Sequence, residues 1–389
     1  MTSSLPNALR IALVVHYSPE NYGNHLVNFA TKRLLETRAS SVTLIRFVGL
    51  RNELRGASLR RLPIKAWRLL SQHQIGARAI SRLRLTISHE SRRPSAPESW
   101  ERNRRFAEFD EKYLQVRDVD VSRRSDLRDS FDLFAVGSDQ IWNYDHELGP
   151  WLFLDFAPSG TRICIAPSIG HSSIPREWWP EYREGLAGFS ELTVRESAGA
   201  ELLAAFAPGT PVSVLPDPTL MLTRDEWMAI SRLPSRSDRY VLVYELGQFS
   251  PDERGFVAGL AETHGLSVLW LSGSRPTSEW ASNASDFLGF VAQAACVVTD
   301  SFHGSVFSFI FDRPLVIVRR GGHASGMNTR IDSLTEQLHL ADRLFGEVSY
   351  DRALEHDYSV GRAALGALQA NFEGFLDRCG LGGPRGTAK

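Results

Sequence analysis

The folding pattern of the chain is clearest in one stretch, Val297-Val298-Thr299-Asp300-Ser301-Phe302-His303-Gly304-Ser305-Val306-Phe307-Ser308-Phe309-Ile310-Phe311. The apolar and largely β-branched residues at 295–298 predict a buried strand. Asp300 and Ser301 then supply a turn and a helix cap. From Ser305 onward, closely spaced apolar residues predict a mostly buried helix. The stretch therefore predicts strand, turn and helix, with His303 in the turn.

This turn is a candidate site. In a parallel α/β sheet it lies at the carboxyl end of a strand, where ligands bind. The start of the following helix offers free N–H groups and a partial positive charge to an anion. Two interpretations of His303 remain open. The imidazole either donates or accepts a proton beside a bound anion, or it caps the turn by bonding to a neighbouring carbonyl group.

The first half of the chain repeats the strand–turn–helix pattern. A strand at 9–15 precedes the turn Asn21-Tyr22-Gly23-Asn24 and a helix at 25–38. A strand at 131–136 runs into Gly137-Ser138-Asp139-Gln140, where small residues let the backbone approach a ligand. Arg195 ends a short strand, where it could bind a carboxylate or phosphate or pair with a local acid such as Glu196. Further strands are predicted at 42–47, 151–156 and 162–168.

A second α/β series begins after a proline-bearing connection. Prolines at 216, 218 and 234 mark the passage between domains. Strands are then predicted at 240–244, 267–271 and 315–318, and helices at 251–264, 286–295 and 331–338. The pattern predicts an N-terminal domain at 1–235, a C-terminal domain at 236–345 and a helical tail at 346–389.

Composition narrows the class of protein. The chain has 389 residues, 43% of them hydrophobic, and a net charge of -1. This balance predicts a globular protein with no general attraction to nucleic acid. Cys164, Cys296 and Cys379 are far apart and predict neither a disulfide set nor a metal site. A polar start and the lack of a ~20-residue apolar run predict a cytoplasmic protein.

Residues 51–105 differ from the rest of the chain. They contain 14 arginines and lysines against four glutamates, a local charge of +10. Leucines, isoleucines and Trp67 are interleaved with the arginines. A basic amphipathic segment of this kind could contact an anionic membrane surface or grip an anionic acceptor. The alternative is a solvated helical insertion whose arginines face water. The segment therefore leaves peripheral membrane association open.

Taken in order, the motifs resemble those of the polysaccharide pyruvyl transferase family. The matching segments are Asn21–Asn24, Val136–Asn143, Ile165–Gly170, Val194–Ser197, Asp217–Leu220, Thr299–Ser305 and Arg330–Leu340. Each segment alone is short, but their order across nearly the whole chain is specific to the family. Residues 51–105 lie outside the match.

The resemblance implies an α/β fold of two Rossmann-like domains in a glycosyltransferase-B-like arrangement, with the active site in an interdomain cleft. It further implies that pyruvate passes from phosphoenolpyruvate to two hydroxyls of a sugar as a cyclic ketal. The acceptor would be a cell-surface or exported glycan, or its lipid-linked precursor. No metal ion and no organic cofactor are expected for this reaction.

The family's functional residues map onto particular positions of this chain. The motif histidine is His303, the donor-binding arginine is Arg195, and Asp139 would orient a sugar hydroxyl or His303 itself. Several family members carry an arginine where this chain has Ser301. The residues expected at the substrate are Asn21, Tyr22, Gly23, Asn24, Gly137, Ser138, Gln140, Asp300, Ser301, Gly304, Ser305 and Arg330. Departing phosphate would be stabilised by Arg195, Arg330 and the helix start at 304–305.

Two other functions use the same architecture. A glycosyltransferase would take a nucleotide sugar in place of phosphoenolpyruvate. A non-catalytic binding protein would keep the fold without turnover, an interpretation prompted by Ser301.

Overall fold

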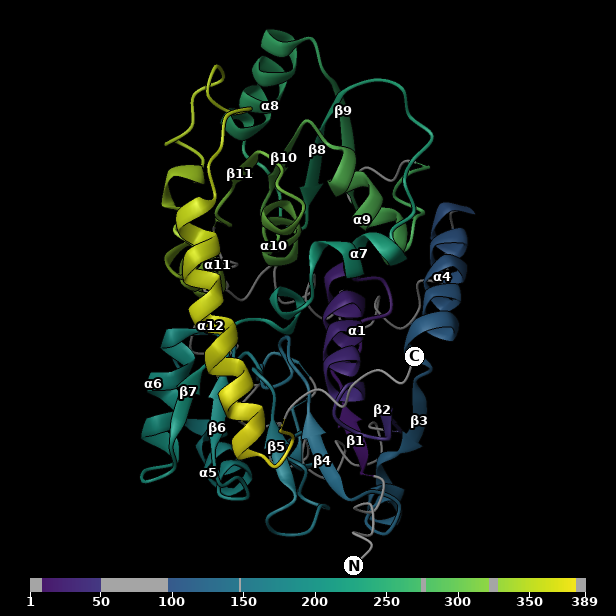
Figure 1. The fold of residues 1–389 in the computed structure, drawn as a ribbon, viewed down its shortest axis with the longest axis vertical. Coiled ribbons are helices and arrows are strands. Elements are labelled where there is room, and N and C mark those ends of the chain that lie inside the picture. Colours follow the sequence, from purple (N-terminus) through teal and green to yellow (C-terminus); the bar gives the residue numbers. More distant parts are fainter. Residues whose placement is uncertain (1–8, 50–96, 147, 274–277, 322–327, 383–389) are drawn as a thin grey trace, which may run out of the picture.

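A five-stranded parallel sheet forms the centre of the first half of the protein (Figure 1). In spatial order its strands are β3 (Arg117–Asp120), β2 (Ser41–Val48), β1 (Arg10–Val14), β4 (Leu133–Val136) and β5 (Arg162–Cys164). A two-stranded parallel sheet follows, with β6 (Leu192–Val194) and β7 (Val212–Val214). The structure is a computed structural model that describes residues 9–49, 97–146, 148–273, 278–321 and 328–382.

The second half contains a four-stranded parallel sheet in the order β11-β10-β8-β9. Its strands are β8 (Tyr240–Glu245), β9 (Ser267–Ser272), β10 (Cys296–Thr299) and β11 (Leu315–Ile317). All residues of β8 and β10 are buried. Continuous burial accounts for the unbroken apolar runs in the sequence, because strands covered on both faces need no alternation.

Helices cover the sheets and connect the strands. They are α1 (Tyr22–Glu36), α4 (Pro97–Phe109), α5 (Trp179–Leu186), α6 (Ser197–Phe206), α7 (Arg224–Ile230), α8 (Pro251–His264), α9 (Ala284–Gln293), α10 (Phe302–Ile310), α11 (Asn328–Gln337) and α12 (Ser359–Arg378). Several carry strong start signals: α8 has a capping box between Ser250 and Glu253 and ends at Gly265 in the left-handed conformation.

Each of the two larger sheets has a point where the strand order reverses. The chain places β2 on one side of β1 and β4 on the other, and it places β9 on one side of β8 and β10 on the other. In open α/β sheets, ligands bind outside the carboxyl ends of the strands at such a point. Residues that follow these strands, among them Asp139 and His303, meet at the junction of the two halves, as described below.

The two halves share apolar packing at this junction. One hydrophobic cluster runs from β1 and α1 through α9 and α10 to α12. Tyr22 of α1 stacks on Phe287 of α9, with ring centroids 4.9 Å apart and planes inclined by 8°. The halves are therefore held together by a continuous core as well as by polar contacts.

The structure confirms the predicted fold class of two Rossmann-like α/β halves, and it corrects some boundaries. Helix α1 begins at Tyr22 and α10 at Phe302, each about one turn earlier than predicted. The strand predicted at 151–156 is wrong. Pro150–Phe153 form a 3₁₀ turn, begun by the fixed φ of Pro150 and ended by Leu154 with φ 58°.

The described residues bear only in part on the predicted domain limits. The boundary at 235/236 falls in the connection between α7 and β8 and stays a prediction. Most of the basic segment 51–105 lies outside the described residues, and membrane contact through it also stays a prediction. Helix α12 of the tail runs along both halves (Figure 1), and Gln369 Nε2 donates to Leu220 O at 2.7 Å in the first half.

Candidate functional site

The turn after β1 supplies the first part of the candidate site. Asn21 caps α1 by accepting the backbone N–H of Asn24 at 3.1 Å. Asn24 accepts the N–H of Ser18 at 2.9 Å and donates to Asp139 Oδ2 at 2.9 Å. Asn21 and Asn24 therefore fix the start of α1, and Asn24 connects it to the end of β4.

A buried chain of ion pairs extends from Asp139. The Asp139 carboxylate lies 3.5 Å from Arg195 Nη2, and Arg195 Nη1 pairs with Asp217. The three residues follow β4, β6 and β7 and are all at least nine-tenths buried. Asp217 also accepts the backbone N–H of Thr219 at 2.9 Å and its hydroxyl at 2.6 Å. Three strand ends are thereby joined through one guanidinium.

Neighbouring positive charges affect the pKa of Asp139 and Asp217 more strongly than burial does. Burial by itself would raise the pKa of Asp139, but the positive charge of Arg195 and further cationic groups lowers it below the usual range. The pKa of Asp217 is lowered in the same way, with Arg195 as its main cationic neighbour. Both carboxylates are therefore ionised at neutral pH.

His303 completes a ring of contacts across the junction. It lies in the first turn of α10, where Ser301 caps the helix by accepting the N–H of Gly304 at 3.2 Å. The imidazole Nε2 lies 3.8 Å from Asp217 Oδ2 and is buried with no hydrogen-bond partner among the described residues. Its other side packs on Gly23 of α1, because a Cβ built on Gly23 would fall 2.8 Å from the Cβ of His303. His303 thus joins the second half to the first.

Arg330 stands next to this ring without a counter-ion. It lies in the first turn of α11, from the second half, and is buried, and no carboxylate of the described residues lies within ion-pair distance of it. Both of its terminal nitrogens lie 2.8 Å from the side-chain amide of Gln140, which follows β4. Burial and the positive charge of Arg195 lower the pKa of Arg330 to about 10. The group remains a cation at neutral pH and has no anionic partner among the described residues.

The structure therefore brings together several predicted residues: Asn21, Gly23, Asn24, Asp139, Gln140, Arg195, Ser301, His303, Gly304 and Arg330. Gly137 and Ser138 lead β4 toward Asp139, and their polar groups bond to backbone at Val14 and Ala166. Ser305 donates to the Ser301 carbonyl at 3.2 Å. These three contacts support the turns structurally, and a contact of these residues with substrate stays a prediction.

Two predicted residues lie apart from the ring. Tyr22 is fully buried between Phe106 and Phe287, and its hydroxyl accepts from Arg102 Nη1 at 2.6 Å. Asp300 faces the second half, where it accepts the N–H groups of Leu246 and Gly247 at 2.8 and 2.6 Å. The contacts of both residues are structural ones.

Sequence reasoning missed three residues of the site. Asp217 is a motif residue that directly follows β7, the same strand-end position that singled out Asp139. His16 follows β1, stacks on His146 at 4.9 Å and is one of the cationic groups that lower the pKa of Asp139. Glu196 is fully buried and accepts the N–H groups of Ile169 and Gly170 through one oxygen at 2.8 and 3.0 Å. Strand-end position was the signal available for Asp217 and His16.

The described part of the chain contains neither a metal-binding cluster nor a membrane-spanning helix. No group of three or more His, Cys, Asp or Glu side chains is placed to hold a metal ion there. Within the same residues, no helix has the length and apolar character needed to cross a membrane. The predictions of no metal and no organic cofactor stay predictions.

Comparison with known proteins identifies the class to which the fold and site belong. The polysaccharide pyruvyl transferase family model matches residues 21–322, well over half of the chain. The protein is a member of the polysaccharide pyruvyl transferase family. No curated protein matches the chain.

Solved structures with similar backbones have low sequence identity. The UDP-GlcNAc 2-epimerase of Neisseria meningitidis bound to UDP-GlcNAc is 10% identical, covering 93% of this chain and 99% of its own, with a TM-score of 0.41. The N-terminal domain of Candida albicans trehalose-6-phosphate phosphatase is 11% identical over 97% and 98%, with a TM-score of 0.46. The ADP-heptose LPS heptosyltransferase II of E. coli is 11% identical over 93% and 99%, with a TM-score of 0.32.

Proposed function

We propose that the protein transfers the pyruvyl group of phosphoenolpyruvate to two hydroxyls of a sugar, as a cyclic ketal, in the synthesis of a cell-surface or exported polysaccharide. Family membership supports the reaction class. The observation that carries the proposal is Arg330, a buried cation without a carboxylate partner among the described residues, next to the Asp139–Arg195–Asp217 network. A buried unpaired charge is costly, so an anionic donor bound there would relieve that cost.

The arrangement assigns different tasks to the two buried arginines. Arg195 is already paired with Asp139 and Asp217, and its guanidinium lies 4.2 Å from the centre of the Phe302 ring. It is suited to holding these carboxylates in place. Arg330 is suited to binding the phosphate or carboxylate of phosphoenolpyruvate. This assignment moves the main donor contact from Arg195, the residue expected by resemblance, to Arg330.

The residues fit the required steps. A proton adds to the methylene carbon of phosphoenolpyruvate, and the positive charge that develops on its central carbon is attacked by a sugar hydroxyl, which loses its proton. The bond from that carbon to the phosphate oxygen breaks, and inorganic phosphate leaves. The second hydroxyl then attacks the same carbon, loses its proton and closes the ketal. The atoms balance as donor plus diol giving ketal plus phosphate.

His303 is the group placed to move protons in this sequence. Its Nε2 has no hydrogen-bond partner among the described residues and lies close to Asp217, which can orient the ring. Arg330 would stabilise the phosphate as negative charge builds up on it. Ser301 serves as the cap of α10, so the positive charge that other family members carry at this position would come from Arg330.

The test compares Arg330→Met with the wild-type protein. We expect phosphoenolpyruvate affinity, measured by calorimetric titration, to fall about 10- to 100-fold, since hydrogen bonds to charged groups contribute about 1.5–3 kcal/mol. Stability should stay unchanged or rise, because the substitution removes an unpaired buried charge. Ketal formation on a glycan acceptor, followed by phosphate release and mass spectrometry, should depend on both Arg330 and His303.

Two results would contradict the proposal. One is binding of phosphoenolpyruvate that is unaffected by Arg330→Met. The other is transfer of a sugar from a nucleotide sugar to the acceptor, with no incorporation of pyruvate. Arg352→Met is a suitable control, because Arg352 is an exposed arginine paired with Glu355 on the same half of the protein.

A further inference from the structure

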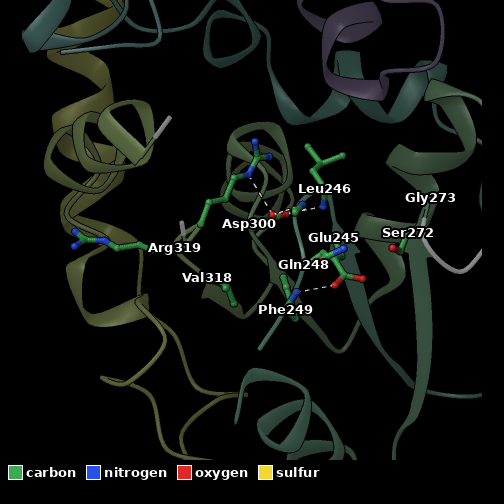
Figure 2. A pocket seen from close by; sticks show the side chains of 12 residues that line it. Glu245, Leu246, Gln248, Phe249, Ser272, Gly273, Asp300, Val318 and Arg319 are labelled. Carbon is green, nitrogen blue, oxygen red and sulfur yellow. Dashed lines mark hydrogen bonds and ion pairs between the residues drawn. The ribbon is translucent and has the colours of Figure 1, made fainter. Parts of the chain in front are cut away.

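A cavity lies at the carboxyl ends of the strands of the four-stranded sheet, and none of Asp139, Arg195, Asp217 and His303 lines it. It has a volume of about 690 Å³ and is lined by the residues that follow β8, β9, β10 and β11. Figure 2 shows Glu245 and Asp300 among its lining residues, at the ends of the two strands between which the order reverses. Its place and size are those of a ligand pocket in an α/β sheet.

The wall of this pocket is held in a fixed shape by Asp300. One oxygen of its carboxylate accepts the N–H of Leu246, and the other accepts the N–H of Gly247 and lies 3.2 Å from Arg320 Nε. A Cβ on Gly247 would fall 2.8 Å from that second oxygen, so a larger residue there would displace the Asp300 carboxylate. The loop after β8 is therefore organised before any ligand binds.

Glu245 supplies the feature that points to a ligand. Its side chain is fully buried. Oε1 accepts the N–H of Phe249 at 2.8 Å and a hydrogen bond from Arg254 at 2.7 Å. Oε2 is buried with no hydrogen-bond partner among the described residues. A buried carboxylate oxygen left in this way costs free energy unless a donor reaches it, so a ligand that fills the pocket should bring an N–H or O–H group.

The charges around the pocket indicate what kind of ligand could supply this hydrogen-bond donor. The pocket is lined by Glu245, Asp300, Arg319 and Arg320. Arg254 pairs with Glu245 behind the wall, and Asp332 pairs with Arg319 at 2.7 Å. Three positive and three negative groups thus cancel. In Figure 2 the Arg319 side chain also extends away from the Glu245 carboxylate. A pocket whose described residues carry no net charge offers little to a diphosphate and suits a neutral ligand rich in hydroxyls.

We infer that this pocket binds a neutral carbohydrate unit, with Glu245 Oε2 accepting one of its hydroxyls. The inference rests on the proposed function, and it assigns the pocket to the glycan acceptor. Asp300 on the pocket wall is three residues from His303, a separation of at most about 10 Å along the chain. A glycan held at Glu245 could therefore extend toward the reacting centre while phosphoenolpyruvate occupies Arg330.

Binding of small sugars tests the inference without turnover. The probes are the methyl glycosides of glucose, galactose, mannose and N-acetylglucosamine, with uridine diphosphate as the anionic comparison. Titrations followed by saturation-transfer NMR would use the full chain as wild type, as Glu245→Gln and as Glu262→Gln. The first variant keeps the shape but turns the free acceptor into a donor; the second changes an exposed glutamate of α8.

At least one glycoside should bind the wild type and Glu262→Gln equally and bind Glu245→Gln about tenfold more weakly or worse. The thermal unfolding midpoint of Glu245→Gln should fall below that of the wild type, because Arg254 loses its counter-ion. Phosphoenolpyruvate binding, measured at a temperature where the variant is folded, should match the wild type. The inference is overturned if no glycoside binds the wild type, if binding ignores the Glu245 substitution, or if only uridine diphosphate depends on Glu245. If the wild type does not bind phosphoenolpyruvate at all, the proposed function is refuted instead.

Discussion

The contact between Gly23 and His303 can be tested by adding one methyl group. In Gly23→Ala the new Cβ would lie 2.8 Å from the Cβ of His303 and closer still to its ring. His303 is buried among Phe302, Asp217 and α1, so the ring has little room to move. The methyl group must therefore displace either the imidazole or the start of α1.

The expected size follows from two opposing effects. Alanine in place of glycine within a helix normally adds up to about 1 kcal/mol of stability. Overpacking a buried contact costs about 1–3 kcal/mol. The clash should prevail, so Gly23→Ala should be less stable than the wild type by as much as about 2 kcal/mol. Because the displaced group is His303, turnover should also fall, even at temperatures where the variant stays fully folded.

Gly366→Ala provides the matched control. Gly366 lies in α12, and a Cβ built there meets no atom within 4 Å. This variant should be as stable as the wild type or slightly more stable. Urea denaturation of the wild type and both variants gives the comparison. If Gly23→Ala matches or exceeds the stability of Gly366→Ala, the packing of His303 against α1 is wrong.

Two further substitutions test the buried charges. Arg195→Met leaves Asp139 and Asp217 buried without their main cation, so we expect a loss of about 3–5 kcal/mol in denaturation experiments. Both carboxylates have pKa values below the unfolded value of about 3.9, so their contribution to the stability of the wild type is present above about pH 4 and disappears as the pH falls below it. The same loss of stability on acidification in Arg195→Met would contradict this. Arg102 of α4 lies 3.7 Å from the ring centre of Trp280 in the second half and donates to Tyr22 of α1 in its own half, so Arg102→Ala should cost about 2–4 kcal/mol. Arg104→Ala, an exposed change in the same helix, should cost little, and equal losses in both would refute a specific role for Arg102.

The sequence predicts the part of the site that depends on strand ends. His303, Asp139 and Arg195 each follow a strand of a parallel sheet, and the carboxyl ends of such strands meet at one edge. Partners across the junction could not be predicted, because they depend on how the halves pack. Asp217 illustrates this: its motif was visible, but its link to His303 exists only once α10 rests against α1.

The same limit applies to roles within the motifs. The pattern around Asp300 and His303 suggested one site, yet the two side chains face different places, one a pocket of the second half and the other the ion-pair ring. Pro150–Phe153 were misassigned because an apolar run of that length is common to strands and to buried turns. Local sequence shows neither which way the Asp300 and His303 side chains face nor whether Pro150–Phe153 form a strand or a turn.

The path of helix α12 affects the order in which the protein can fold. Its last turns contact the first half: Arg378 pairs with Glu191, and Glu373 pairs with Arg38 at the end of α1. Arg38 and Glu373 are separated by 335 positions in the chain. At about 5–20 residues per second of synthesis, the earlier partner waits tens of seconds for the later one. The N-terminal half therefore leaves the ribosome with part of its surface uncovered and reaches its final packing only after α12 has been synthesised.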